Sequence, residues 1–129
     1  MSITPVERIA AVLLGLEGVT LFGFAGWELV ALVSGDLESL SSSIALIVLT
    51  VLGACAVVAF AVAVWRGASW GRSGGIVAQL LVLAVALGAI SGPDPQPGSA
   101  LMIAAPAIVG LGLLIAAARA AARRVKESE

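Results

Sequence analysis

The stretch LLGLEGVTLFGFAGWELV, residues 13–30, is apolar enough to cross a lipid bilayer, yet it contains two carboxylates, Glu17 and Glu28. It belongs to a longer apolar run over residues 9–33, and a transmembrane helix needs about 20 mostly apolar residues. Ionisable side chains are costly inside a bilayer, so those that occur there usually face the bundle interior or a wet cavity. The stretch therefore predicts a first transmembrane helix with an inward-facing polar stripe.

The composition extends this expectation to the whole chain. Of the 129 residues, 60% are hydrophobic and 12% are charged, whereas soluble domains are about 45–50% apolar and about 25% charged. We expect three further spans, at 44–65, 74–91 and 99–118. Their short connections favour antiparallel neighbours. The sequence thus predicts an all-α, integral membrane four-helix bundle that forms a single transmembrane domain over residues 1–129.

The distribution of basic residues predicts the orientation. All seven Lys and Arg residues precede the first span, separate the second from the third, or follow the fourth. The other two loops carry only acidic charges, Asp36, Glu38 and Asp94. Since cytoplasmic loops are enriched in Lys and Arg, we expect both termini in the cytoplasm, a basic cytoplasmic tail at 119–129, and insertion into a bacterial inner (plasma) membrane.

Part of this basic set forms a candidate surface for anionic lipid headgroups. Three of its members share one helical face after the fourth span, and a purely topological role for them is the alternative. The candidate headgroup contacts are Arg66, Arg72, Arg119, Arg123 and Lys126.

The two glutamates of the first span lie on one helical face, because eleven residues return within about 20° of the starting direction. Thr20 lies close to the same stripe. Glu17 is about 12 Å from the inner end of its span at 1.5 Å per residue, whereas Glu28 is about 7–8 Å from the outer end. Holding the carboxyl group inside the bilayer costs more for Glu17 than for Glu28, because the Glu28 side chain can extend partly towards water.

Depth also predicts partners for these carboxylates in the other spans. Gln79 enters the third span at a level similar to that of Glu17, and Thr50 reaches a level in the second span similar to that of Glu28. We therefore expect an inner polar layer of Glu17 with Gln79 and an outer layer of Glu28 with Thr50. Arg66 and Arg72 are alternative partners for Glu17. Two roles remain open, namely hydrogen bonds that hold helices together and a proton or cation site.

The composition argues against most enzyme chemistries. The chain has no histidine, no tyrosine and one cysteine, Cys55, so the commonest metal ligand and general base is missing and no intramolecular disulfide can form. We expect no catalytic residue, no metal and no cofactor. The net charge of −1 argues against a nucleic-acid partner.

The link WRGASWGRSGGIVAQLL (65–81) is a basic, tryptophan-containing loop followed by a glutamine in the third span. With its Ala-, Val-, Leu- and Gly-rich surroundings, it resembles small uncharacterised four-span membrane proteins of high-GC actinobacteria. That resemblance implies a fold but no activity.

The four spans, the short chain and Glu17 in the first span are also similar to small multidrug resistance transporters. This similarity implies that Glu17 binds protons and cations. The chain departs from that family in lacking tyrosine, in its third span, which is not aromatic-rich, and in Glu28, which has no counterpart there.

These observations favour a non-enzymatic membrane protein, either a structural or accessory subunit or a self-associating bundle. Its expected partners are the lipid bilayer and either further copies of itself or a larger membrane complex. The alternative is a small proton-coupled transporter or channel that uses the membrane-embedded Glu17.

Overall fold

The computed structural model describes residues 3–35 and 40–129, so Asp36 and Glu38 of the first loop lie outside the described residues. The described chain is all-helical, and each of its four helices is long and apolar enough to cross a membrane. A helix suits such a segment because it satisfies its own backbone hydrogen bonds in lipid. The helices are α1 (Pro5–Val33), α2 (Leu40–Trp65), α3 (Ser69–Ser91) and α4 (Pro97–Ser128).

The helices extend beyond the predicted spans, mostly at their N-terminal ends. The first three end at the predicted residues 33, 65 and 91, but each begins four or five residues early. In α1 the cause is a capping box, in which Thr4 and Glu7 satisfy each other's backbone N–H groups and Pro5 occupies the first turn. In α4 the basic tail stays helical as far as Ser128.

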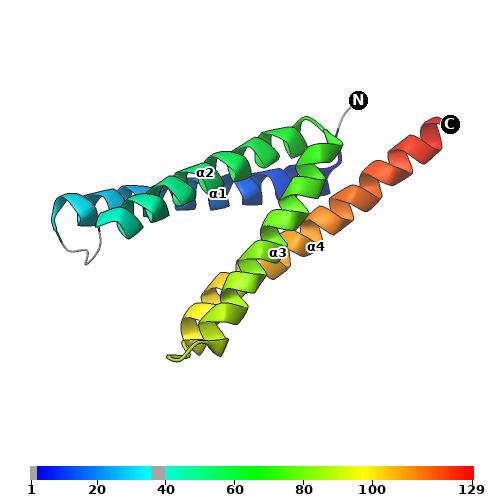
Figure 1. The fold of residues 1–129 in the computed structure, drawn as a ribbon. Helices are drawn as coiled ribbons and strands as arrows, with labels where there is room; N and C mark the ends of the chain where they lie inside the picture. Colours follow the sequence, from blue (N-terminus) through cyan, green and yellow to red (C-terminus); the bar gives the residue numbers. More distant parts are fainter. Residues whose placement is uncertain (1–2, 36–39) are drawn as a thin grey trace.

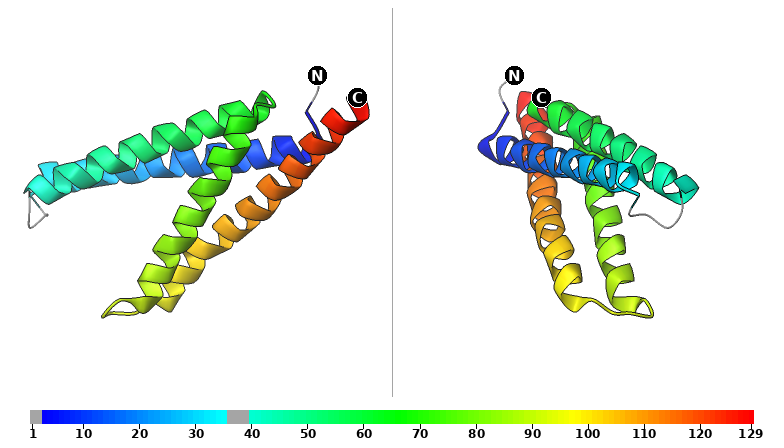
Figure 2. Two further views of the ribbon diagram at one scale, coloured as in Figure 1. Left: turned by 45° about the vertical axis from the view of Figure 1, so that its right-hand side comes forward. Right: turned by 90° about the vertical axis from the view of Figure 1, so that its left-hand side faces the viewer.

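The four helices form two arms that meet at one end (Figure 1). We call α1 with α2 the first arm and α3 with α4 the second arm, because α1 packs mainly on α2 and α3 mainly on α4. Both chain ends and the α2–α3 turn lie where the arms meet, and the arms diverge away from it in each view (Figure 2). The contact between the two arms is therefore concentrated at one end of the helices.

The hydrophobic core lies at this meeting point, which we call the junction. It contains residues from α1, α2 and α4, with Ile76 and Ala78 of α3 packed against it. Away from the junction, large apolar side chains on all four helices remain exposed. The buried core residues are Ala10, Ala11, Leu14, Val57, Ala61, Val64, Leu114 and Ala117.

Glycines allow the helices to approach closely in and near the junction. A Cβ at Gly18 of α1 would come within 2.5 Å of Val58 on α2, and one at Gly71 of α3 would come within 2.7 Å of the Val64 backbone nitrogen. At Gly110 of α4 a Cβ would press on the Gln79 amide. Small residues have this role where lipid removes the hydrophobic drive for helix association.

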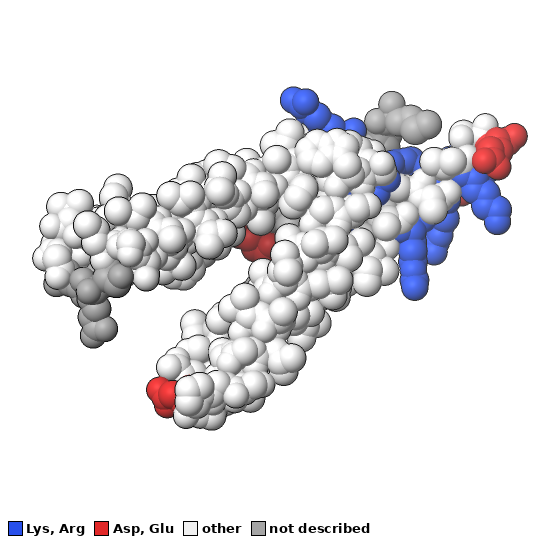
Figure 3. All heavy atoms as spheres, in the orientation of Figure 1, with Lys and Arg blue, Asp and Glu red and all other residues white. Residues whose placement is uncertain are grey.

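Charge is distributed unequally over the molecule. Basic side chains gather at the end that carries the termini, which we call the basic end (Figure 3). The same view shows an open wedge between the arms, with acidic atoms at its inner corner and at the tip of the second arm. The walls of the wedge are otherwise uncharged in this view.

Candidate functional site

The first polar site joins the two arms. Nε2 of Gln79 on α3 donates a hydrogen bond to Oε2 of Glu17 on α1 over 2.6 Å. Gln79 is fully buried, whereas Glu17 is half-buried. The expected contact between these two side chains is therefore confirmed, and among the described side chains it is Gln79, not an arginine, that donates to Glu17.

The Gln79 amide is only half satisfied. Its Oε1 is buried and accepts no hydrogen bond from any residue in the described part of the chain. This oxygen faces the backbone of α4 near Gly110, where a Cβ would lie 3.1 Å from it. The site thus combines a carboxylate with a free amide acceptor, so it offers a place for a hydrogen-bond donor.

The second polar site lies within the first arm. The Thr50 hydroxyl on α2 is 3.3 Å from Oε1 of Glu28 on α1, and it also donates to the Leu46 carbonyl over 2.8 Å. The depth-matched pairing of Glu28 with Thr50 is therefore confirmed. Oε2 of Glu28 is buried and has no partner within the described ranges 3–35 and 40–129.

Thr20 does not join either polar site. Its side chain is exposed, and its hydroxyl donates to the Leu16 carbonyl one turn earlier in α1 over 2.8 Å. This local bond satisfies the hydroxyl without a partner helix. The stripe that runs from Glu17 to Glu28 is thus only partly turned towards other helices.

A third polar cluster lies at the basic end and contains Glu7, which the sequence had not singled out. Glu7 is fully buried and accepts bonds from Arg124 of α4 at 2.5 and 3.1 Å. Nη1 of Arg72 on α3 lies 3.7 Å from the same carboxylate and donates to the Gly67 carbonyl at 3.1 Å. The cluster therefore ties α1 to both helices of the second arm.

Glu7 precedes the apolar run that begins at Ile9, so it belongs to the end of the helix and not to the span. Burial raises the pKa of its carboxyl, but hydrogen bonds from Arg124 and Thr4 and the charge of Arg124 outweigh that effect. The pKa of Glu7 consequently lies below its ordinary value. Glu7 is thus held as a carboxylate that compensates buried guanidinium charge.

The candidate headgroup contacts divide into two groups in the structure. Arg72 is largely buried, with 13% of its side chain exposed, and interacts with Glu7. Its neighbour in the α2–α3 turn, Arg66, is exposed. The three candidates on the last turns of α4 are also exposed, namely Arg119, Arg123 and Lys126.

One signal for Glu7 was available in the sequence. Thr4 and Glu7 have the spacing of a capping box, a serine or threonine followed three residues later by an acidic residue. That pattern predicts a helix start, and Glu7 is also the one acidic residue between the chain's start and the first apolar run. The contact with Arg124 was not foreseeable, because 117 positions separate the two residues.

The described ranges contain no group of three or more Cys, Asp or Glu side chains arranged to hold a metal ion. The side chains of the three polar clusters form hydrogen bonds and ion pairs, and their carboxylates can exchange protons. The four long apolar helices that contain these clusters place the chain in the class of helical, multi-pass membrane proteins. Comparison with protein-family models, curated proteins and solved structures gives no match.

Proposed function

We propose that this chain is a non-enzymatic integral membrane protein that associates with further copies of itself. The observation that carries the proposal is a set of helix glycines facing open space. A Cβ at any of these positions would meet no atom within 4 Å, in contrast to the glycines that pack within the chain. Small residues serve close helix packing in membranes, so they favour contacts with helices outside this chain. They are Gly15, Gly23, Gly26, Gly53, Gly88, Gly98 and Gly112.

A groove on the first arm supports the same proposal. It lies between α1 and α2, has a volume of about 400 Å³ and is almost entirely apolar. Gly15 lies among its lining residues, with Val12 and Val19 on α1 and Val58 and Val62 on α2. Such a groove offers an apolar helix from a second copy close backbone contact.

The experiment measures the mass of the purified protein in detergent and in lipid nanodiscs. We expect the wild type to be a dimer or larger, and Gly15→Leu to shift it towards the monomer. Ala45→Leu places the same leucine side chain at an exposed position of α2 away from the groove, so it should leave the mass unchanged. A monomeric wild type in both media would contradict self-association and favour the role of an accessory subunit in a larger complex.

We further propose that neighbouring spans are antiparallel and that both termini face the cytoplasm of a bacterium. The gathering of basic side chains at the end that carries the termini supports this orientation, since cytoplasmic loops are rich in Lys and Arg. Arg8 stacks over Trp65, with its guanidinium carbon 5.7 Å from the ring centroid. Tryptophan is enriched at membrane interfaces, which supports a membrane surface at this level.

A second candidate function is proton-coupled transport through Glu17. The observation that favours it is the Glu17–Gln79 pair, where a half-buried carboxylate lies beside an amide oxygen with a free acceptor site. In proteoliposomes, Glu17→Gln should abolish uptake of a lipophilic cation driven by a pH gradient, while Glu28→Gln should retain it. Absence of uptake by the wild type would reject this candidate.

A further inference from the structure

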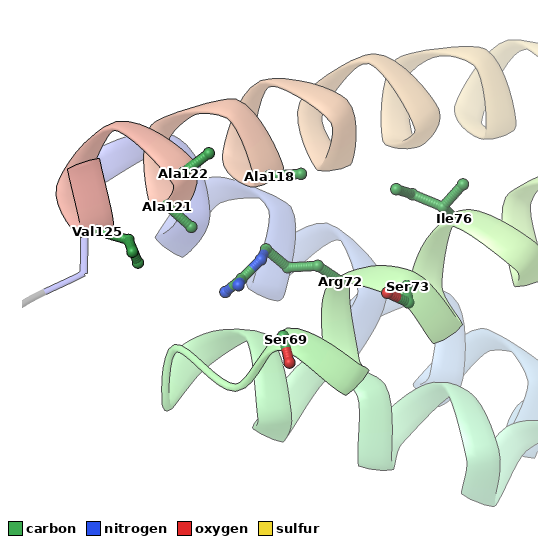
Figure 4. A pocket seen from close by; sticks show the side chains of 8 residues that line it. All are labelled: Ser69, Arg72, Ser73, Ile76, Ala118, Ala121, Ala122 and Val125. Atoms are coloured by element: carbon green, nitrogen blue, oxygen red, sulfur yellow. The ribbon is translucent and has the colours of Figure 1, made fainter.

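A cavity at the basic end belongs to none of the polar sites in the spans. It lies between the first turns of α3 and the last turns of α4, with a volume of about 270 Å³ (Figure 4). One wall is polar and consists of Ser69, Arg72 and Ser73 on α3. The facing wall is apolar and includes Ala118, Ala122 and Val125 on α4. The cavity thus presents a cation and two hydroxyls opposite a smooth hydrocarbon surface.

Arg72 retains donors that the described residues do not use. Within the described chain, its side-chain contacts involve Nη1 alone, which donates to the Gly67 carbonyl and lies 3.7 Å from Glu7. A guanidinium has five N–H donors in a rigid fork. The Nη2 and Nε groups of Arg72 therefore remain available for an anion with several oxygens.

The charge around Arg72 is incompletely compensated. Two guanidiniums, of Arg72 and Arg124, share the single carboxylate of Glu7. Arg124 is much the closer of the two and takes both carboxylate oxygens. A largely buried cation favours a further counter-ion, because an uncompensated charge is costly away from water. Arg72 is therefore the more distant of the two guanidiniums from the Glu7 carboxylate, and it lies next to an open cavity.

The level of the cavity indicates where such an anion comes from. Trp65 and Trp70, which lie on either side of the α2–α3 turn, are about half exposed, as is typical of side chains at the boundary between hydrocarbon and headgroups. A phosphate at this level is supplied by the bilayer itself. The apolar wall formed by α4 suits the glycerol and upper acyl portion of a lipid.

We propose that this cavity binds the phosphate of an anionic phospholipid headgroup. Arg72 donates from its free Nη2 and Nε groups to two phosphate oxygens. The planar guanidinium of arginine suits this bidentate contact better than the ammonium of lysine does. Ser69 and Ser73 supply hydroxyl donors, and Ala118, Ala122 and Val125 contact the apolar part of the lipid. The bound lipid supplies a second anion beside Arg72, whose Nη1 lies 3.7 Å from the Glu7 carboxylate.

Native mass spectrometry of the full chain released from micelles tests the proposal. The probes are dioleoyl phosphatidylglycerol and dioleoyl phosphatidylcholine, which share the acyl chains but differ in net charge. We expect the wild type to retain phosphatidylglycerol preferentially, and Arg72→Gln to lower its affinity about tenfold, as for one lost charge-assisted contact. Arg66→Gln removes the same charge from an exposed arginine in the preceding α2–α3 turn and should change the affinity less than twofold.

Two further measurements keep the test decisive. Ala122→Leu fills the cavity from the exposed side of α4 without touching any charge, and it should also weaken phosphatidylglycerol binding even if Arg72→Gln fails to fold. Equal retention of the two lipids, equal losses in Arg66→Gln and Arg72→Gln, or unchanged binding by Ala122→Leu would each overturn the proposal. Retention of inorganic phosphate without any preference for phosphatidylglycerol would assign the cavity to free phosphate and overturn the lipid assignment.

Discussion

The Gln79 amide donates to the Glu17 carboxylate over 2.6 Å, across the junction between the second arm and the first. Both side chains come from apolar helices, so neither has water as an easy alternative partner. The contact therefore links two elements that otherwise diverge. Within residues 3–35 and 40–129, Oε1 of Gln79 accepts no hydrogen bond, so the Gln79 amide differs from a fully satisfied structural contact.

Substitutions of Glu17 and Gln79 should differ in their effects on the free energy of unfolding. Glu17→Gln retains an acceptor for Gln79, so we expect the free energy of unfolding to fall by less than about 0.6 kcal/mol. Gln79→Leu leaves the Glu17 carboxylate without its donor and should cost about 0.6–2 kcal/mol. Unfolding in mixed micelles, followed by tryptophan fluorescence, measures the free energy of unfolding of both variants. Equal losses would show that the hydrogen bond itself does not account for the effect.

The Glu7 cluster should contribute more to stability than the pair in the spans. Glu7→Gln leaves Arg124 and Arg72 without a buried carboxylate, and breaking such a pair typically costs about 3–5 kcal/mol. We expect the loss to loosen the contact between the arms. The distribution of distances between spin labels at the tips of the two arms should be broader in the variant than in the wild type. Glu127→Gln removes an exposed carboxylate from the same end, and an equal effect of this control would refute the prediction.

Stability should also depend on pH through Glu7. Because the pKa of Glu7 is lower in the folded protein than in the unfolded chain, its contribution to stability is present above the pKa of the unfolded chain and is lost as the pH falls through the pKa of the folded protein. Unfolding measured from pH 7 downwards should therefore show a loss of stability in the acidic range. Glu7→Gln should flatten that part of the curve, and an unchanged curve would contradict the assignment.

Glycines inside and outside the packed regions should respond oppositely to an added methyl group. Gly71→Ala places a Cβ within 2.7 Å of the Val64 backbone, so crowding should cost about 1–3 kcal/mol. Gly112→Ala meets no atom of its own chain within 4 Å, so in a detergent that keeps the protein monomeric it should gain about 0.5–1 kcal/mol from helix propensity. Thermal unfolding of both variants checks the sign. A stabilised Gly71→Ala would show that the helices can separate at little cost.

Cysteine labelling tests the proposed orientation. In a Cys55→Ser background, Asp94→Cys in the α3–α4 loop should react with an impermeant maleimide from outside intact cells. Ser128→Cys at the end of α4 should react only after the cells are opened. The reverse pattern would invert the proposed topology and place the basic end outside the cell.

The sequence by itself determined the secondary structure and the depths of the polar groups. Four long apolar runs are enough to specify four helices, because lipid leaves the backbone no other partner than itself. A constant rise per residue then placed Glu17 level with Gln79 and Glu28 level with Thr50. These two pairings could therefore be anticipated before the helices were positioned.

Only the tertiary structure decided which helix faces pack and which charges are buried. Depth does not specify rotation about a helix axis, so it could not show that Thr20 would turn outwards and bond its own backbone. Nor could local patterns reveal that Glu7 and Arg124, 117 positions apart, would meet in a buried ion pair beside Arg72. Such contacts depend on how closely glycine-bearing faces approach, a property of several helices together and not of any one segment.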